Sequence, residues 1–288
     1  MAKIENVQFI IPVPGQSYTD IRPTISGEDW DDIRTTAMKL AEGVGNLKLS
    51  QVLSGQEKRQ EQPLTSSQRI IGDGVLFDEA EHTYSKGGKQ YLSGSTFAHL
   101  FEKEFPRDAI AQKVANKSGK EPDEVLKGWD SKGEISLQYG TLIHKCIETW
   151  CVFGEKPNNA YLQTIVDDWN EVFKDDPIDF NELFVQDDTH RLCGIIDGLG
   201  GNTIYDWKTG DIHQKIQHTL EGFPNDRLSL YTLQLNFYKY IVEQNGGKVD
   251  HLVIGWLNGE HWEKVKVDII DIVPYLKKAT EELWKPNK

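Results

Sequence analysis

Residues 194–210, GIIDGLGGNTIYDWKTG, carry two aspartates and a lysine at spacings that suit phosphate chemistry. The pattern predicts two short strands joined at a glycine pair, with Asp197 near the end of the first strand and Asp206 near the end of the second. Antiparallel pairing would bring the two carboxylates together, where they repel by about 4 kcal/mol at about 4 Å and an effective dielectric of about 20. A bound cation turns that repulsion into attraction, so the pair predicts a site for a hard divalent ion.

Lys208 follows Asp206 by two residues, and the period of a strand places both side chains on one face. An ammonium group there could lower the pKa of a metal-bound water and stabilise negative charge that develops on a phosphate oxygen. The alternative to a catalytic site is a strand whose polar residues simply face solvent, because Asp-x-Lys is a common spacing and Asp-Gly often marks only a turn. These residues alone therefore favour the alternative, and further motifs must support a catalytic site.

The order Asp197, then Asp206-Trp207-Lys208, resembles the signature of PD-(D/E)XK nucleases in its RecB-like form. Glu182, which opens the preceding predicted strand, resembles an additional acid that many members carry. The same region is crowded with other acidic residues, most of which must face water, so a solvated role for Glu182 stays open.

Two further segments resemble motifs of the same family. Residues 140–148, GTLIHKCIE, are similar to the helical G-T-x-x-H-x-x-x-E segment of RecB-like exonucleases, in which the histidine binds metal. Residues 234–238, QLNFY, are similar to the Q-x-x-x-Y motif on the helix after the catalytic lysine. The resemblance covers about residues 75–284 and is greatest to the mitochondrial genome maintenance exonuclease and related phage exonucleases.

The resemblance implies a deoxyribonuclease that uses one or two Mg²⁺ or Mn²⁺ ions and no iron–sulfur cluster. The implied metal ligands are His144, Glu148, Glu182, Asp197, Asp206 and the backbone carbonyl of Trp207. The implied catalytic residues are Asp197, Asp206, Lys208, Gln234 and Tyr238, of which Lys208 positions and activates the attacking water and the last two hold substrate. The implied partner is DNA, with exonuclease action on single-stranded ends during replication, repair or recombination, and a phage origin fits the subgroup.

Each helical motif has a structural alternative. His144 could be a packed core histidine, but on a helix it shares a face with Glu148 at i+4. Glu148 could bind metal or orient the imidazole, and the sequence leaves both roles open. A nitrogen ligand would shift the preference from Mg²⁺ toward Mn²⁺. Gln234 and Tyr238 lie one helical turn apart, so they could contact a phosphate, order the lysine, or be a solvated amide and a core tyrosine.

The rest of the chain supplies the elements that must position these residues. Helical spacing and capping residues predict helices over 95–105, 109–117, 138–153, 161–173, 228–243 and 273–284. Strands are predicted over 182–186, 191–199, 203–207, 249–257 and 261–267, and a hairpin over 75–92 turns at Gly87-Gly88. The order αβββαβ indicates an α/β (α+β) fold, and the resemblance specifies a restriction-endonuclease-like PD-(D/E)XK core with a mixed central sheet flanked by helices.

Composition limits the classes of protein that need to be considered. The chain has 288 residues, 38% of them hydrophobic and 27% charged, and no apolar run approaches the roughly 18 residues that a membrane span needs. Its first residues do not resemble a secretion signal, so we expect a cytoplasmic protein without a membrane partner. Three cysteines without a C-x-x-C pair argue against a disulfide framework, a structural zinc site and an iron–sulfur cluster.

The net charge of −13 is unusual for a protein that grips phosphates. A site that carries its own cations can nevertheless be built of carboxylates and attract a polyanion. Residues 1–70 have weak patterning, with a possible helix over 28–40 and a polar stretch over 54–68, and are predicted to form an appendage and linker of unknown role. Residues 71–288 are predicted to form the nuclease domain. The alternative function is a non-catalytic module that binds nucleic acid or protein on the same fold.

Overall fold

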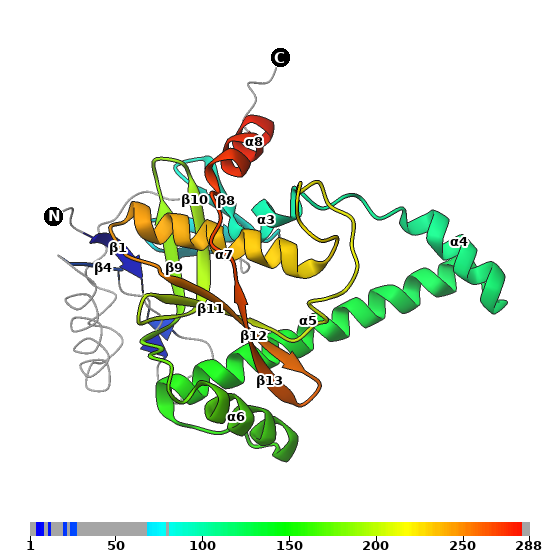
Figure 1. The fold of residues 1–288 in the computed structure, drawn as a ribbon, viewed down its shortest axis with the longest axis horizontal. Helices are drawn as coiled ribbons and strands as arrows, with labels where there is room; N and C mark the ends of the chain where they lie inside the picture. Colours follow the sequence, from blue (N-terminus) through cyan, green and yellow to red (C-terminus); the bar gives the residue numbers. More distant parts are fainter. Residues whose placement is uncertain are drawn as a thin grey trace.

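A mixed β-sheet crosses the protein, and helices cover both of its faces (Figure 1). The structure is a computed structural model that describes residues 4–8, 11–12, 20–21, 24–27, 68–78 and 81–283. The strands of the main sheet are β1 (Ile4–Gln8), β4 (Thr24–Gly27), β5 (Gln68–Ile71), β6 (Val75–Asp78), β7 (Thr83–Lys86), β8 (Lys89–Ser93), β9 (Phe180–Asp187), β10 (Leu192–Gly200), β11 (Thr203–Lys208), β12 (His251–Asn258) and β13 (His261–Val267), while β2 (Ile11–Pro12) pairs with β3 (Asp20–Ile21).

Strand β10 is the centre of this sheet. It pairs with β9 along one edge, while β8 and β11 share its other edge, β8 near its first residues and β11 near its last. The pairs β8 with β10 and β11 with β12 are parallel, and the pairs of β10 with β9 and with β11 are antiparallel. The predicted meander of three strands and the mixed central sheet flanked by helices are confirmed.

Alternate residues of the central strands build two cores, because successive side chains of a strand point to opposite faces. Ile204 and Ile254 belong to a core with α7 (Arg227–Gln244), which also packs on α3 (Gly94–His99). Tyr205 and Trp207 belong to a second core with α5 (Pro122–Phe153) and α6 (Ala160–Phe173). The sheet therefore separates α7 from α5, and any site at the ends of β10 and β11 can draw residues from both layers.

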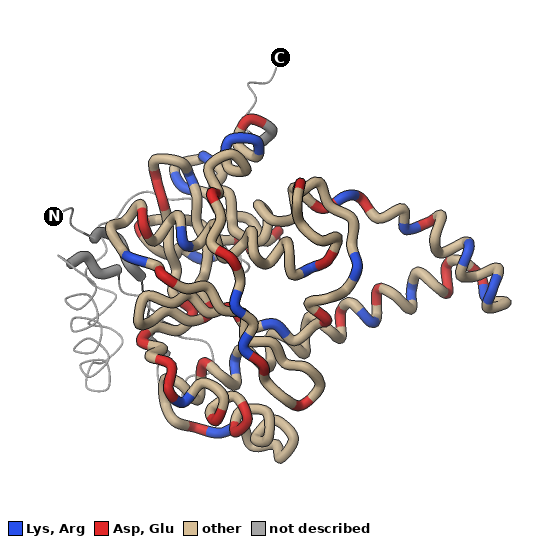
Figure 2. Tube along the Cα trace, viewed as in Figure 1, with Lys and Arg blue, Asp and Glu red and all other residues tan. Residues whose placement is uncertain are grey.

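Helices α4 (Arg107–Ser118) and α5 extend away from the sheet as a pair (Figure 1). Every residue over 131–138 of α5 is exposed, so this part of the helix packs on no other described element. Lys and Arg alternate with Asp and Glu along both helices (Figure 2). The second half of α5 returns to the sheet and carries the predicted histidine motif.

Three predicted elements differ from the structure, and the first is the helix predicted over 95–105, which ends at His99 as α3. The helix predicted over 138–153 is the end of the single 32-residue helix α5, which begins with Pro122 at its first turn. Gly128 and Gly133 interrupt the apolar pattern there, but a helix tolerates each glycine at a cost of about 1 kcal/mol. The predicted hairpin over 75–92 contains three strands, β6 to β8, because a second turn precedes Thr83.

The N-terminal region is only partly described. The predicted helix over 28–40 and all but the last residue of the polar stretch over 54–68 lie outside the described residues. Strand β1 pairs with β9 and with β4, and β5 pairs with β6, so three strands from residues 1–71 add to the sheet of the later region. The division into an appendage and a domain stays a prediction. Among the described residues, the helices lack the combination of length and apolarity that crossing a membrane requires.

Candidate metal centre

His144, Glu182 and Asp197 meet at one point between α5 and the sheet. Each contributes one ligand atom, and these three atoms lie within 4.8 Å of one another. The Nδ1 atom of His144 is 3.8 Å from Oε1 of Glu182 and 3.7 Å from Oδ1 of Asp197. The three side chains are 28%, 23% and 12% exposed, so the point is accessible from solvent yet largely shielded by protein.

Helix packing positions the histidine. Ile143 and Ile147 of α5 are 0% and 1% exposed and anchor the helix in the second core. His144 lies next to this buried stripe and is directed toward the strand ends, where its Nε2 is 2.9 Å from the carbonyl oxygen of Trp207. The helix therefore holds the imidazole at the sheet by its apolar contacts.

Strand register positions the two acids. The pairs Ile196 with Leu183 and Gly198 with Asn181 bracket Asp197 and Glu182, which therefore face each other across β10 and β9. Glu182 has a φ of +50°, a left-handed conformation that costs a non-glycine residue about 1–3 kcal/mol. Opposed like charges and a strained backbone both oppose folding, and such strain is concentrated at functional sites.

The backbone of Trp207 orients both the acid and the imidazole. Its N–H donates to Oδ2 of Asp197 at 2.7 Å, so only Oδ1 of that carboxylate faces His144. Its carbonyl oxygen is the partner of Nε2, and in the neutral tautomer that donates this hydrogen bond the Nδ1 lone pair faces the carboxylates. A histidine that binds metal through one nitrogen usually donates its other N–H to a carbonyl or carboxylate. His144 has this arrangement, with the carbonyl oxygen of Trp207 as the acceptor.

The pKa values of the ionisable groups show that the centre favours a bound positive charge. Burial by itself lowers the pKa of His144, but the charges of Asp197 and Glu182 raise it to about 9. Burial raises the pKa of Asp197, the charge of His144 lowers it, and that of Glu182 raises it again. At neutral pH a proton on the imidazole therefore supplies the cation that the two carboxylates require. A divalent ion bound by one nitrogen and two carboxylate oxygens would supply it instead, and this donor set suits Mn²⁺ or Mg²⁺.

Asp206 and Lys208 lie beside these three residues. Continuing the antiparallel register past Gly198 and Tyr205 by one residue sets Asp197 opposite Asp206. Asp206 is almost fully buried, and its Oδ2 is 2.5 Å from Nζ of Lys208, as the i, i+2 spacing predicts. Burial raises the pKa of Asp206 to about 6, against the opposing effect of the lysine.

The ammonium group of Lys208 is held from two sides. Asp206 contacts it on one side, and on another it lies 4.8 Å from the centre of the Tyr231 ring, a cation–π contact. Burial lowers the pKa of Lys208, but Asp206 and Asp197 raise it above its ordinary value. The group therefore stays protonated at neutral pH. Tyr231 was not identified from the sequence, although it precedes Gln234 by three residues and so lies on the same face of the helix.

Gln234 and Tyr238 contact each other and lie at the edge of the centre. The amide of Gln234 donates to the Tyr238 hydroxyl at 3.0 Å. Tyr238 is buried, and burial together with the charge of Asp206 raises the pKa of its phenol well above the ordinary value. Neither side chain ligates at the triad. Gln234 and Tyr238, four residues apart on one face of the helix, are therefore joined by a direct hydrogen bond.

Glu148 is the predicted ligand that the structure does not bring to the triad. Its carboxylate accepts a hydrogen bond from Nζ of Lys145 at 2.9 Å, and no contact joins it to His144 among the described residues. Glu148 therefore pairs with a lysine of its own helix, and the glutamate beside His144 is Glu182 of β9.

Comparison with known proteins adds little. No protein-family model and no curated protein match this sequence. Among solved structures, SSO0001 is 14% identical with a TM-score of 0.23, over 33% of this chain and 42% of that chain. A protein from Eubacterium rectale that carries the provisional name of an exonuclease is 14% identical with a TM-score of 0.32, over 67% of this chain and 76% of that chain. The functional argument therefore rests on the centre itself.

Proposed function

We propose that this protein is a metal-dependent nuclease of the RecB-like PD-(D/E)XK type that hydrolyses phosphodiester bonds of DNA. The finer proposal is an exonuclease that acts on single-stranded ends in replication, repair or recombination. One observation carries it, namely the convergence of the His144, Glu182 and Asp197 triad with the buried Asp206–Lys208 pair. These residues come from one helix and three strands, and their combination of acids, imidazole and ammonium is what metal-assisted phosphate hydrolysis requires.

The residues of the triad would hold the ion, with Asp206 and the Trp207 carbonyl next to them. When bound, Mg²⁺ or Mn²⁺ supplies Lewis-acid polarisation of the phosphodiester and neutralises its developing negative charge. The raised pKa of Lys208 keeps its amine charged at neutral pH. Lys208 therefore acts as a hydrogen-bond donor that orients the attacking water and stabilises charge on a phosphate oxygen, and a protonated amine accepts no proton.

Asp206 and Tyr231 keep this donor in place. Without Asp206 the ammonium would lose its closest counter-charge, and without the Tyr231 ring it would lose the contact on another side. Gln234 presents its amide beside Tyr238 and is available to a substrate phosphate if that hydrogen bond is exchanged. These side chains fix where the donor lies before substrate arrives, which is the condition for electrostatic stabilisation of a transition state.

The direct test is incubation of end-labelled single-stranded and double-stranded DNA with the protein in Mg²⁺, Mn²⁺ or EDTA. We expect metal-dependent shortening, greater for single strands, and none in EDTA. Asp197→Asn is expected to abolish it because that residue supplies one of the two carboxylates of the triad. Binding of DNA without cleavage in either metal would contradict the proposal and favour the non-catalytic module.

Substitution of Lys208 tests the role of the ammonium group. Lys208→Ala is expected to reduce the cleavage rate about 10²–10³-fold, as does removal of one preorganised donor elsewhere. The control is Lys266→Ala, which removes one positive charge from an exposed residue of edge strand β13. Circular dichroism checks that both variants are folded. Cleavage by folded Lys208→Ala at the native rate would refute the role.

A further inference from the structure

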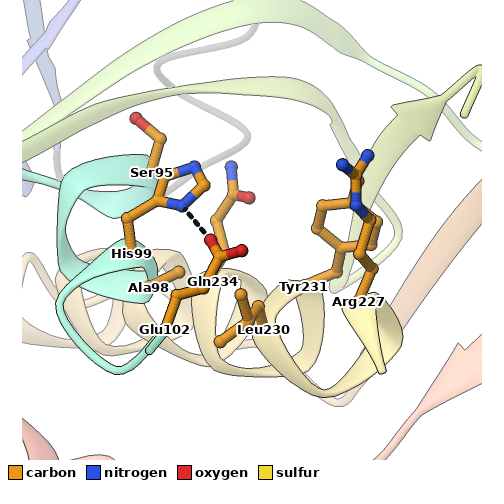
Figure 3. A pocket seen from close by; sticks show the side chains of 8 residues that line it. All are labelled: Ser95, Ala98, His99, Glu102, Arg227, Leu230, Tyr231 and Gln234. Carbon is orange, nitrogen blue, oxygen red and sulfur yellow. Dashed lines mark hydrogen bonds and ion pairs between the residues drawn. The ribbon is translucent and has the colours of Figure 1, made fainter. Parts of the chain in front are cut away.

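A cavity lies between α3 and α7, with a volume of about 180 Å³. Ser95, His99 and Glu102 form one wall, and Arg227 and Tyr231 stand on the other, with Gln234 between them (Figure 3). Ala98 and Leu230 also line the cavity, so polar groups and apolar surface share its lining, and its two walls come from segments more than a hundred residues apart in the chain.

The cavity adjoins the metal centre. Tyr231 lines the cavity and contacts Nζ of Lys208 with its ring, at 4.8 Å from the ring centre. Gln234 also lines it and donates to Tyr238, whose phenol experiences the charges of Asp206 and Asp197. A group bound in the cavity would therefore lie one side chain away from the proposed catalytic lysine.

Arg227 provides the cavity with a positive charge that forms no ion pair with a described carboxylate. It is the first residue of α7 and half-buried, and no carboxylate pairs with it anywhere in the described part of the chain. By contrast, Arg107 pairs with Asp130 and Lys208 pairs with Asp206. A guanidinium nitrogen of Arg227 lies 3.8 Å from the position of a Cβ on Gly210, two residues after Lys208, so the charge is directed toward the end of β11.

The acid of the cavity has a partner on its own wall. Glu102 is engaged by Nδ1 of His99 at 2.8 Å on the opposite wall (Figure 3). The arginine wall is therefore positive and the facing wall holds a paired acid and a serine hydroxyl. A guanidinium fork with no protein partner matches the geometry of a phosphate, to which it can donate two parallel hydrogen bonds.

We propose that this cavity binds a backbone phosphate of the DNA strand next to the phosphodiester that is cleaved, with Arg227 as its main ligand. The inference rests on the proposed function for the identity of the strand. It assigns to Arg227 a binding role, in which the residue sets the register of the strand relative to Lys208 and takes no part in the chemistry.

The salt dependence of DNA binding tests the contact without cleavage. Binding of a fluorescent single-stranded oligonucleotide is measured in EDTA at several salt concentrations for the native protein, Arg227→Ala, Arg227→Lys and the control Lys266→Ala. Loss of one phosphate contact should reduce the slope of log K against log salt by about 0.7 for a single strand. We expect this reduction with Arg227→Ala, with an affinity loss of about tenfold. We expect the native slope with Arg227→Lys and with the control.

A scan of the substrate identifies the phosphate. Oligonucleotides that carry one uncharged methylphosphonate at successive positions are bound to the native protein and to Arg227→Ala. One position should weaken native binding and leave the binding of Arg227→Ala unchanged, because the two losses remove the same contact. Oligonucleotides with and without a terminal phosphate distinguish an internal phosphate from a terminal one.

The outcomes separate this inference from the proposed function. An unchanged salt slope for folded Arg227→Ala, a position effect that persists in this variant, or dependence on a terminal phosphate alone would overturn the inference even if metal-dependent cleavage is observed. If Arg227 couples to one internal phosphate but the protein never cleaves DNA, the result supports the inference about the cavity and contradicts the proposed nuclease function. Native protein that does not bind DNA in EDTA at low salt would contradict the inference directly.

Discussion

The two oxygens of Asp197 have different neighbours, and this difference directs the site. Oδ2 accepts the backbone N–H of Trp207 at 2.7 Å, whereas Oδ1 faces Nδ1 of His144 at 3.7 Å. Because one oxygen is fixed by the backbone, the carboxylate cannot rotate freely toward a different partner. The free oxygen therefore points to where Glu182 and His144 also direct a ligand atom.

Two glutamates offer a matched test of which acid holds the ion. Glu182→Gln removes a charge from the triad, and Glu148→Gln removes one from an acid that is paired with Lys145. We expect the affinity for Mn²⁺ to fall about tenfold or more for Glu182→Gln and less than about twofold for Glu148→Gln, as measured by calorimetry. Equal losses in the two variants would assign Glu148 to the centre and contradict the structure.

The affinity for Mn²⁺ should rise with pH. The pKa of His144 is raised to about 9, so in the metal-free protein the imidazole is protonated at neutral pH, and the ion must displace that proton from Nδ1. Affinity should therefore increase by up to about tenfold per pH unit toward pH 9 and level off above it. Calorimetry in buffers of different ionisation enthalpy should detect the released proton.

The same shift has the opposite sign for the stability of the metal-free protein. The folded pKa of His144 lies above its ordinary value of 6.5, so its contribution to stability is present in full below pH 6.5 and is lost as the pH rises through about 9. The buried Asp206, with its pKa raised to about 6 from 3.8, acts in the same direction at lower pH.

Affinity for Mn²⁺ that is constant between pH 6.5 and 8.5 would contradict displacement of the imidazole proton.

At the scale of elements, the approach of α7 to β10 and to α3 depends on two glycines. A Cβ on Gly194 of β10 would lie 2.4 Å from Cε1 of Tyr238, and one on Gly94 of α3 would lie 2.6 Å from the same atom. Both distances are shorter than van der Waals contact allows. The tyrosine ring therefore fills space that only glycine leaves open, and the helix that carries Gln234 is seated by this contact.

Gly194→Ala is expected to destabilise the protein by about 1–3 kcal/mol, because the added methyl group must displace the Tyr238 ring. It should also reduce cleavage, since Gln234 moves with the helix. The control is Gly128→Ala in the exposed part of α5, where an added Cβ contacts nothing within 4 Å. That change should stabilise the protein by about 0.5–1 kcal/mol. Thermal unfolding measures both, and a neutral Gly194→Ala would show that α7 can shift without cost.

At the scale of the whole molecule, the centre connects parts of the chain that are far apart. His144 comes from helix α5 on one face of the sheet, and Glu182 and Asp197 come from strands β9 and β10 of the sheet itself. An ion held by all three binds the folded state and has no comparable site in the unfolded chain. Metal binding should therefore stabilise the entire fold.

Addition of Mn²⁺ at about 100 times its dissociation constant should stabilise the protein by about 2.7 kcal/mol. For a protein of 288 residues the midpoint of thermal unfolding should then rise by about 4–5 °C. The His144→Ala variant should lose most of this rise, because it retains the sheet and removes one ligand. A rise of equal size in the variant would place the bound ion elsewhere.

The net charge of −13 also acts at this scale, because the protein as a whole repels a polyanion. Along α4 and α5 the positive residues alternate with acids (Figure 2). Attraction of a DNA strand would thus depend on local charge at the centre and in the cavity beside it. An ion bound in the triad would supply positive charge at the centre, and Arg227, which no described carboxylate pairs, supplies it in the cavity.

Local pattern was enough to predict most of the fold. Strand period, glycine pairs and helical spacing depend on neighbouring residues, so the sequence predicted β9 to β13, α6, α7 and α8 (Val273–Leu283) within a few residues. For the same reason it predicted that Asp206 and Lys208 share a face, since an i, i+2 spacing on a strand leaves no alternative.

Only the tertiary structure decided which acid joins His144. Glu148 is four residues away along the helix and Glu182 is 38 residues away, yet the distant acid lies at the triad and the near one pairs with Lys145. Helix spacing brings two residues to one face, but the direction of that face depends on how α5 packs its buried isoleucines on the sheet. The cavity that contains Arg227 has the same origin, because it exists only where α3 and α7 meet. Such contacts arise from the packing of the whole chain, and no local spacing encodes them.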